Sequence, residues 1–365
     1  MSEQATDDTA AEGTAKRSST PKMVLRIVLS LVLIAAIFYY LLKDISLADV
    51  WAAITAMTWV ELVILAVVAG WNLITYVFVW MAVTPGLSPG RAMVMTQATT
   101  AITNTVPAGS AIGVGMTYAM MGSWGFSRSR TTIAVLVSGV WNAFAKLAIP
   151  VLALALVALQ GNASPGRITA ATLGIGGLIA AVVVFALMLR SERMAERVGI
   201  VAGRFMSRLL AVIRRPPVQG WEIATVKFRN RTVDLLEHGW VPITAATVVS
   251  HLSLYLVLLV CLRDVGVSNA EVNWAEVLAV FAFARLATAV PITPGGAGVV
   301  EAVLITGLTA AGGDKPSVVA AVLVFRALTW GLPILVGIFC LLWWRKQSLT
   351  ARAADGASAT GAARP

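Results

Sequence analysis

The stretch Ala287–Leu304, ATAVPITPGGAGVVEAVL, interrupts a region that is otherwise apolar enough for a membrane helix. Two prolines and three glycines fall within it, and a glutamate follows them at position 301. Non-helical backbone at membrane depth leaves N–H and C=O groups unpaired unless it lies against protein or a wet cavity. The stretch therefore predicts a broken helix that lines such a cavity.

Composition places the chain among polytopic membrane proteins. Of its 365 residues, 58% are hydrophobic and 13% are charged, whereas a soluble domain has roughly 25% charged residues. The net charge of +10 is not concentrated in a separate basic domain, which favours a membrane surface and excludes a nucleic-acid partner. Cys261 and Cys340 lie in apolar runs, and His238 and His251 are isolated, so we expect no disulfide, metal site or cofactor.

Apolar runs of about 20 residues, the length that crosses a bilayer as a helix, predict six full spans. They lie at residues 24–42, 60–82, 131–158, 168–189, 241–262 and 317–344. Two further regions, 91–121 and 275–311, are apolar but broken by glycine and proline. Each is long enough to enter the membrane and return as a re-entrant hairpin. We expect one all-α transmembrane domain over 23–346, with disordered cytoplasmic tails at 1–22 and 347–365.

The region 190–240 is basic and amphipathic. Ten basic residues and three glutamates lie between Arg190 and Arg231, and loops rich in Lys and Arg stay in the cytoplasm. We therefore place this region and both termini on the cytoplasmic side. Consistency then requires that 91–121 enters and leaves from the cytoplasm and that 275–311 does so from outside.

Within this region, arginines recur at helical spacing beside an apolar stripe. The pattern predicts a helix that lies in the headgroup layer and contacts anionic lipid, although an ordinary positive-inside loop has similar features. The arginines assigned to this contact are Arg193, Arg197, Arg204 and Arg208.

The two broken regions resemble each other. TNTVPAGSAIGVG, from Thr103, and TAVPITPGGAGVV, from Thr288, both run from Val-Pro through small residues to glycine. Pro107 and Pro291 are 184 positions apart, and the same offset aligns Asn142 with Arg326. One Gly/Pro cluster is ordinary in a membrane helix, but two at related positions predict an inverted repeat with a transporter's midplane site.

Four charged residues lie within apolar segments, namely Arg285, Glu301, Arg326 and Lys146. Intramembrane charges cost roughly 2.5–3.5 kcal/mol each and normally face a partner or a cavity. One glutamate cannot neutralise three cations, whereas a phosphate suits the forked donors of arginine and a free helix N-terminus. We expect Glu301 to match Arg285 and leave Arg326 as the excess charge. A static Arg–Glu clamp that pins the hairpin is the alternative.

The predicted headgroup site also contains the residues of both breaks. They are Pro291, Pro294, Gly295, Gly296 and Gly298 in the second broken region, Asn104 and Pro107 in the first, and the repeat-related Asn142. The prolines end one helix, the glycines permit a tight turn, and a new helix is expected near Val299 with Glu301 in its first turn.

RLATAVPITPGGAGVVEA and the later VFRALTWGLPILVG are similar to the signature of the lysylphosphatidylglycerol synthase transmembrane-region family. This is the flippase-domain part of bacterial multipeptide-resistance proteins and of their stand-alone relatives. The likeness covers roughly residues 24–344 and implies two re-entrant hairpins and a role in moving phospholipids or lipid-linked intermediates across the bacterial cytoplasmic membrane.

The resemblance assigns motif positions residue by residue. The second-half positions are Arg285, Pro291, Pro294, Gly295, Gly296, Gly298, Glu301 and Arg326, and the first-half positions are Asn104, Pro107 and Gly113. Many relatives carry charged residues after that last glycine, whereas this chain has GVGMTYAM, so a polar relay is not implied there. The aminoacyl-transferase domain of the full-length synthases is not in this sequence, so lysyl transfer is not implied either.

The leading hypothesis is a translocator of phospholipids or lipid-linked intermediates, and not an enzyme. An accessory membrane subunit of a lipid or glycan synthase is the first alternative. An intramembrane lipid-modifying enzyme with Glu301 as base is the second, although no nucleophile–base pair or phosphate-binding loop is visible in the sequence. The expected partners are anionic membrane phospholipids and a lipid- or glycan-synthesis enzyme. The oligomeric state is not predicted.

Overall fold

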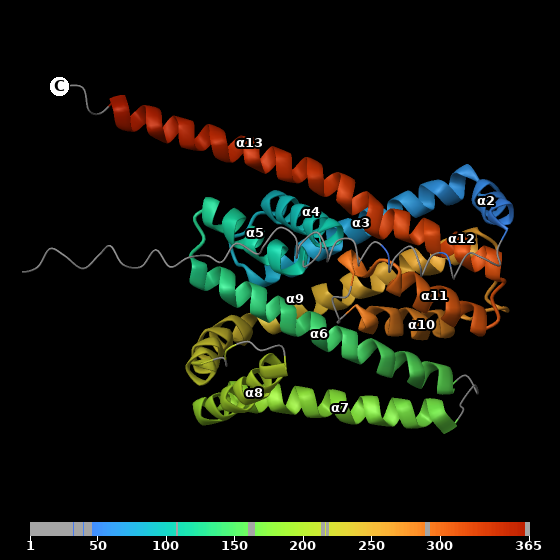
Figure 1. The fold of residues 1–365 in the computed structure, drawn as a ribbon, viewed down its shortest axis with the longest axis horizontal. Coiled ribbons are helices and arrows are strands. Elements are labelled where there is room, and N and C mark those ends of the chain that lie inside the picture. The colour runs from blue at the N-terminus through green and yellow to red at the C-terminus, as the bar shows by residue number, and fades with distance from the viewer. Residues whose placement is uncertain are drawn as a thin grey trace, which may run out of the picture.

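The computed structural model describes residues 32, 39, 46–106, 109–159, 165–212, 216, 219–288 and 293–361, and this part of the chain is all-α (Figure 1). Its helices are α2 (Leu47–Thr55), α3 (Trp59–Val83), α4 (Pro89–Thr105), α5 (Gly109–Ser123), α6 (Arg128–Leu159), α7 (Pro165–Arg190), α8 (Glu192–Val212), α9 (Trp221–Asp264), α10 (Trp274–Ala287), α11 (Val299–Ala310), α12 (Lys315–Arg326) and α13 (Leu332–Gly361). A 3₁₀ turn, η1 (Pro294–Gly296), precedes α11, and a π-helical turn, η2 (Ala327–Gly331), joins α12 to α13.

Five of the predicted spans correspond to helices that are long and apolar enough to cross a membrane. Within the described residues these are Trp59–Val83, Arg128–Leu159, Thr172–Arg190, Gly239–Asp264 and Lys315–Ser348. Only 6% of the apolar window of α7 is buried inside the protein, as expected of a helix that faces lipid. The predicted span 24–42 lies outside the described residues except for positions 32 and 39.

Both broken regions form a helix, a break and a second helix. The four helices α4, α5, α10 and α11 have 17, 15, 14 and 12 residues, each short of the ~20 that cross a bilayer. α4 packs on α5, and α10 packs on α11. The α4–α5 pair lies towards one end of the bundle and the α10–α11 pair towards the other (Figure 1). The two breaks therefore approach each other from opposite ends.

Two apolar clusters flank the region where the breaks meet. One is formed mainly by α9–α12 around Phe281 and Leu304, and the other by α3–α6 and α13 around Met95 and Val137. α13 packs closely along α4 because Gly337 has no side chain, and a Cβ there would overlap the carbonyl oxygen of Gln97. The breaks are thus held between two packed bodies of side chains.

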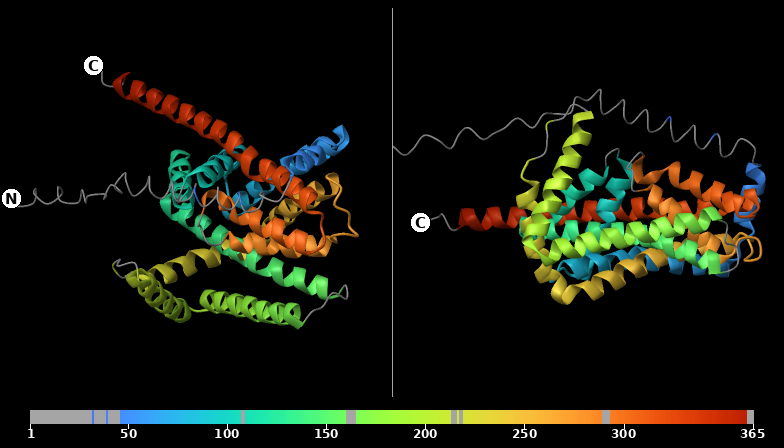
Figure 2. Two further views of the ribbon diagram at one scale, coloured as in Figure 1. Left: turned by 45° about the vertical axis from the view of Figure 1, so that its right-hand side comes forward. Right: turned by 90° about the horizontal axis from the view of Figure 1, so that it is seen from below.

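The basic region 190–240 folds as two helices. α8 packs on α7 and α9 and runs across the direction of the long spans (Figure 2). α9 continues without interruption for 44 residues from this region into the next span. Arg193, Arg197, Arg204 and Arg208 are exposed on α8, and so are the large apolar side chains of Val201 and Phe205. This arrangement fits a helix that lies in the headgroup layer.

The two predicted tails differ in outcome. Residues 1–22 lie outside the described residues. At the other end, α13 continues to Gly361, whereas the sequence predicts a disordered tail from residue 347. Five alanines between positions 351 and 361 favour a helix there, because alanine has the highest intrinsic helix propensity.

Candidate functional site

The second break has the backbone geometry that its glycines predict. Gly295, Gly296 and Gly298 have φ angles of 57°, 69° and 82°, which L-residues with a Cβ rarely adopt. α11 begins at Val299, and Glu301 lies in its first turn, where the helix dipole favours a carboxylate. The sequence predictions for this start and for the position of the glutamate are confirmed. Pro291 and Pro107 lie outside the described residues.

A buried ion pair joins Glu301 to Arg326, and not to Arg285 as the sequence suggested. Arg326 Nε lies 2.7 Å from Glu301 Oε1, and the two side chains are 11% and 5% exposed. Arg326 Nη2 also donates to the carbonyl oxygen of Gly295 at 3.3 Å, and its guanidinium lies 5.6 Å from the centre of the Trp330 ring. The predicted pairing of Glu301 with Arg285 is therefore wrong.

Arg285 and Lys146 are the two cations of this group that have no carboxylate partner among the described residues, and Arg285 is the more deeply unsatisfied. Its Nε is buried and makes no hydrogen bond. Nearby, Lys146 Nζ donates to Thr288 Oγ1 at 3.1 Å, and this hydroxyl donates to the carbonyl oxygen of Arg285 at 2.6 Å. Three cations and one carboxylate therefore converge on this region, which leaves a formal charge of +2.

The first broken region meets the second at a cavity of about 190 Å³, which we term the first chamber. Asn104 Nδ2 donates to the carbonyl oxygen of Trp330 at 3.5 Å. A Cβ on Gly295 would lie 2.5 Å from Trp330 Nε1 and 2.7 Å from Asn104 Oδ1, so only glycine permits this approach. The chamber is lined by Arg285, Arg326 and Thr288 in addition to these three residues.

A second cavity of about 190 Å³, the second chamber, shares Arg285 with the first. Its other polar lining residues are Asn72, Tyr76, Thr96, Gln97, Thr100, Asn142, Ser250, His251 and Thr329. Asn142 thus lines the second chamber and Arg326 the first, although the sequence offset aligns the two. Arg285 stands at the junction and is available to both chambers.

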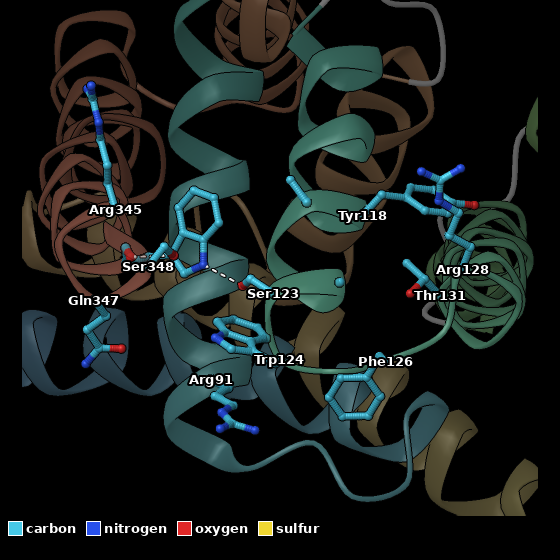
Figure 3. Close-up of a pocket in the computed structure, with 13 residues that line it drawn as sticks. Arg91, Tyr118, Ser123, Trp124, Phe126, Arg128, Thr131, Arg345, Gln347 and Ser348 are labelled. Carbon is cyan, nitrogen blue, oxygen red and sulfur yellow. Dashed lines mark hydrogen bonds between the residues drawn. The ribbon is translucent and has the colours of Figure 1, made fainter. Parts of the chain in front are cut away.

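A third cavity, about 1140 Å³, lies at the end of the bundle where α4, α5, α6 and the segment Trp344–Ser348 of α13 meet; we term it the basic pocket. Figure 3 shows Arg91, Arg128 and Arg345 around it, with the rings of Trp124 and Phe126 among them. The Arg91 guanidinium lies 5.8 Å from the centre of the Trp124 ring. No acidic side chain stands among its described lining residues.

The structure brings together most of the predicted site residues. Those at the two chambers are Arg285, Arg326, Gly295, Asn104 and Asn142, with Glu301 and Lys146 bonded to their edge. Sequence reasoning missed Trp330, Gln97 and His251 and the whole basic pocket. For Trp330 a signal exists, because it follows Arg326 by one helical turn and so lies on the same face. For Gln97 and His251 the sequence holds no comparable signal.

The comparisons with known proteins decide the family. The protein-family model described as "Lysylphosphatidylglycerol synthase TM region" matches residues 27–337 of this chain. The chain belongs to this family. It is therefore a membrane protein, as its long apolar helices require.

The chain is also similar to a curated protein of the lysylphosphatidylglycerol synthase transmembrane-region family. This relative is the inner membrane protein YbhN of Escherichia coli (strain K12), with 28% identity over 141 residues. The aligned part covers 38% of this chain and 43% of YbhN, so the chain matches less than half of its relative's length. The name of that protein places it in an inner membrane.

Proposed function

We propose that the protein translocates phospholipids or lipid-linked intermediates and holds the phosphate of the headgroup in the first chamber. The observation that carries this proposal is Arg285, which lines the first chamber together with Arg326 and whose buried Nε has no hydrogen-bond partner. A buried cation without a partner is costly, and a phosphate diester supplies the missing negative charge and suits arginine's donors. Trp330 Nε1, also buried and without a partner, adds a third donor to the chamber.

The charges at the two ends of the bundle support an orientation. One end has more acidic than basic residues. The acidic residues are Asp49, Glu61, Asp264, Glu271, Glu276 and Asp314, and the basic residues are Arg263 and Lys315. At the other lie Arg91, Arg128, Arg130, Arg190, Arg345 and Lys346. By the positive-inside rule the basic end, with α8 and the basic pocket, faces the cytoplasm.

In this orientation the two helix–break–helix pairs are re-entrant hairpins of an inverted repeat. α4–α5 enters and leaves at the basic end, and α10–α11 enters and leaves at the acidic end. Paired breaks that meet between two membrane faces are the usual position of a transporter's substrate site. The phosphate of a lipid then passes from one face to the other through the first chamber while its acyl chains stay in the bilayer.

Lipid scrambling in proteoliposomes tests this function. Purified wild-type protein is reconstituted with fluorescent anionic phospholipid, and the rate at which an impermeant quencher gains access is measured. Arg285→Gln should abolish transport while the melting temperature stays the same or rises, because the variant removes an unpaired buried charge. Arg285→Lys keeps the charge without the fork and should retain part of the rate.

Lys315→Gln is the matched control, because Lys315 lies at the acidic end of the bundle, away from both chambers. Its rate should equal that of wild type. A wild-type rate no greater than that of protein-free liposomes, or a folded Arg285→Gln protein with the wild-type rate, would show that the proposed function is wrong.

A further inference from the structure

The basic pocket is separate from the two chambers and shares no lining residue with either of them. At about 1140 Å³ it is also much larger than each chamber. A typical small-molecule pocket has ~300–1,000 Å³. The basic pocket is therefore large enough for a complete small ligand.

Positive charge in the basic pocket is not balanced by the protein. Arg91, Arg128 and Arg345 line it, and within the described residues none of them is in an ion pair. The helices α4, α5 and α6 contain no Asp or Glu along their length, and residues 344–348 of α13 contain none. Figure 3 shows the three arginines on different sides of the pocket. A ligand with one negative charge would leave two of these cations unmatched, so a ligand with more charge is favoured.

Two of these arginines lie where the helix dipole disfavours a cation. Arg91 is in the first turn of α4, and Arg128 is the first residue of α6. The partial positive charge at a helix N-terminus opposes a side-chain cation and attracts an anion. An anionic ligand beside these helix starts is therefore stabilised by the backbone as well as by the arginines.

The free side-chain donors of the pocket are the arginine N–H groups and the Gln347 amide. Four hydroxyl groups also line it, but each already donates to the protein at 2.7 to 3.2 Å. Ser123, Thr131 and Ser348 donate to the carbonyl oxygens of Met120, Ser127 and Trp344, and Tyr118 donates to Thr132 Oγ1. Trp344 Nε1 in turn donates to Ser123 Oγ at 3.0 Å. A sugar would find few partners here, whereas phosphate oxygens suit the forked donors of arginine.

Aromatic rings form the apolar part of the wall. The guanidinium of Arg91 lies 5.8 Å from the centre of the Trp124 ring, and that of Arg130 lies 5.6 Å from the centre of the Phe126 ring. Stacking on a ring holds a planar guanidinium in a defined orientation. The pocket thus combines oriented donors with apolar surface against which the remainder of a phosphorylated ligand can pack.

We infer that the basic pocket binds a diphosphate group, in which two linked phosphates carry about two or more negative charges near pH 7. A lipid-linked diphosphate and a soluble nucleoside diphosphate both present this group. The inference rests on the basic pocket alone and does not depend on the proposed function of the chambers.

Calorimetric titration of the purified full chain in nonionic detergent, without magnesium, tests the inference. Wild type should bind inorganic pyrophosphate about tenfold or more tightly than inorganic phosphate. Arg128→Gln combined with Arg345→Gln should weaken pyrophosphate binding by about a hundredfold, since each hydrogen bond to a charged group contributes about tenfold. The matched control is Arg193→Gln combined with Arg197→Gln, which removes the same charge from exposed positions on α8 outside the pocket. Its affinity should stay close to that of wild type.

Gly122→Phe tests the cavity itself, because it occupies space and removes no charge. Gly122 lines the pocket, and a Cβ at this position would meet no atom within 4 Å. The variant should keep its melting temperature and lose pyrophosphate binding. Its association with anionic vesicles should persist, because that association requires the exposed charges and not the space between them.

Farnesyl diphosphate and ADP distinguish the two sources of the group. If farnesyl diphosphate binds more tightly than pyrophosphate and ADP, the ligand is lipid-linked. If ADP binds most tightly, the ligand is a soluble nucleotide. Either result supports a diphosphate site.

Equal affinity of wild type for pyrophosphate and phosphate would overturn the inference, and this measurement needs no variant. A folded Gly122→Phe protein with wild-type affinity, or equal losses in the pocket and α8 variants, would also overturn it. So would displacement of pyrophosphate by phosphatidylglycerol at equal concentration, since the pocket would then recognise an ordinary phospholipid. A protein that binds pyrophosphate but does not scramble lipids would leave the inference standing and remove the translocator.

Discussion

Among individual residues, the pairing of the four charges decides which substitution harms folding. Because Glu301 pairs with Arg326 and both are buried, Glu301→Gln and Arg326→Gln each leave an uncompensated charge in the interior. Each should cost about 3–5 kcal/mol of stability. The double variant should recover much of this loss, since neither charge then remains. Melting temperatures and denaturant midpoints of the purified variants measure this cycle, with Arg285→Gln as the reference.

If Glu301→Gln unfolds no more readily than Arg285→Gln, the ion pair does not stabilise the hairpin. The sequence alone leads to a different expectation, in which Arg326→Gln is the harmless variant. That expectation fails because a sequence shows which charges lie in apolar segments but not which of two arginines reaches a given carboxylate. The local features at the break were predictable, since the glycine φ angles and the start of α11 depend on neighbouring residues only.

At the level of helices, the basic pocket is assembled from α4, α5 and α6 together with α13, which is far from them in the sequence. In the sequence, its arginines have the pattern of ordinary positive-inside residues. Only the fold shows that they lie together around aromatic rings. We expect Arg91→Gln combined with Arg128→Gln to weaken association with anionic vesicles by about 30-fold at low salt, at about 1 kcal/mol per removed charge near the surface. Co-sedimentation with phosphatidylglycerol vesicles at two ionic strengths measures the effect.

The double variant should retain its melting temperature, because both side chains are exposed and neither is in an ion pair within the described residues. Lys315→Gln, at the other end of the bundle, again provides the control and should bind as wild type does. Unchanged vesicle binding with unchanged salt dependence would show that the pocket does not attract lipid. The effect would then belong to α8, whose Arg197 and Arg204 are the next residues to replace.

Across the whole molecule, the sequence predicted the helix content and five of the spans, since hydropathy over about 20 residues needs no tertiary information. It did not predict α2, the continuity of α9 or the extension of α13, because these depend on packing and on propensity in short polar segments. The sequence also predicted that the two breaks lie close together, and this prediction depended on a weak internal repeat. The side of the membrane at which each hairpin begins is the part of the architecture that an experiment must fix.

Cysteine labelling in intact cells tests this architecture. The two native cysteines, Cys261 and Cys340, are buried, so replacing both with alanine gives a silent background. Ser127→Cys lies in the exposed turn between α5 and α6 at the basic end, and Ala270→Cys in the exposed turn between α9 and α10 at the acidic end. An impermeant maleimide should label Ala270→Cys in intact cells and Ser127→Cys only after the membrane is opened, because the positive-inside rule keeps the basic end in the cytoplasm.

The reverse pattern would keep the opposed hairpins but turn the molecule over, and the basic pocket and α8 would then face the outer leaflet. Labelling of both positions from one side would mean that the chain crosses the membrane an even number of times between them. The proposed architecture has three crossings there, α6, α7 and α9, so the inverted repeat would be wrong.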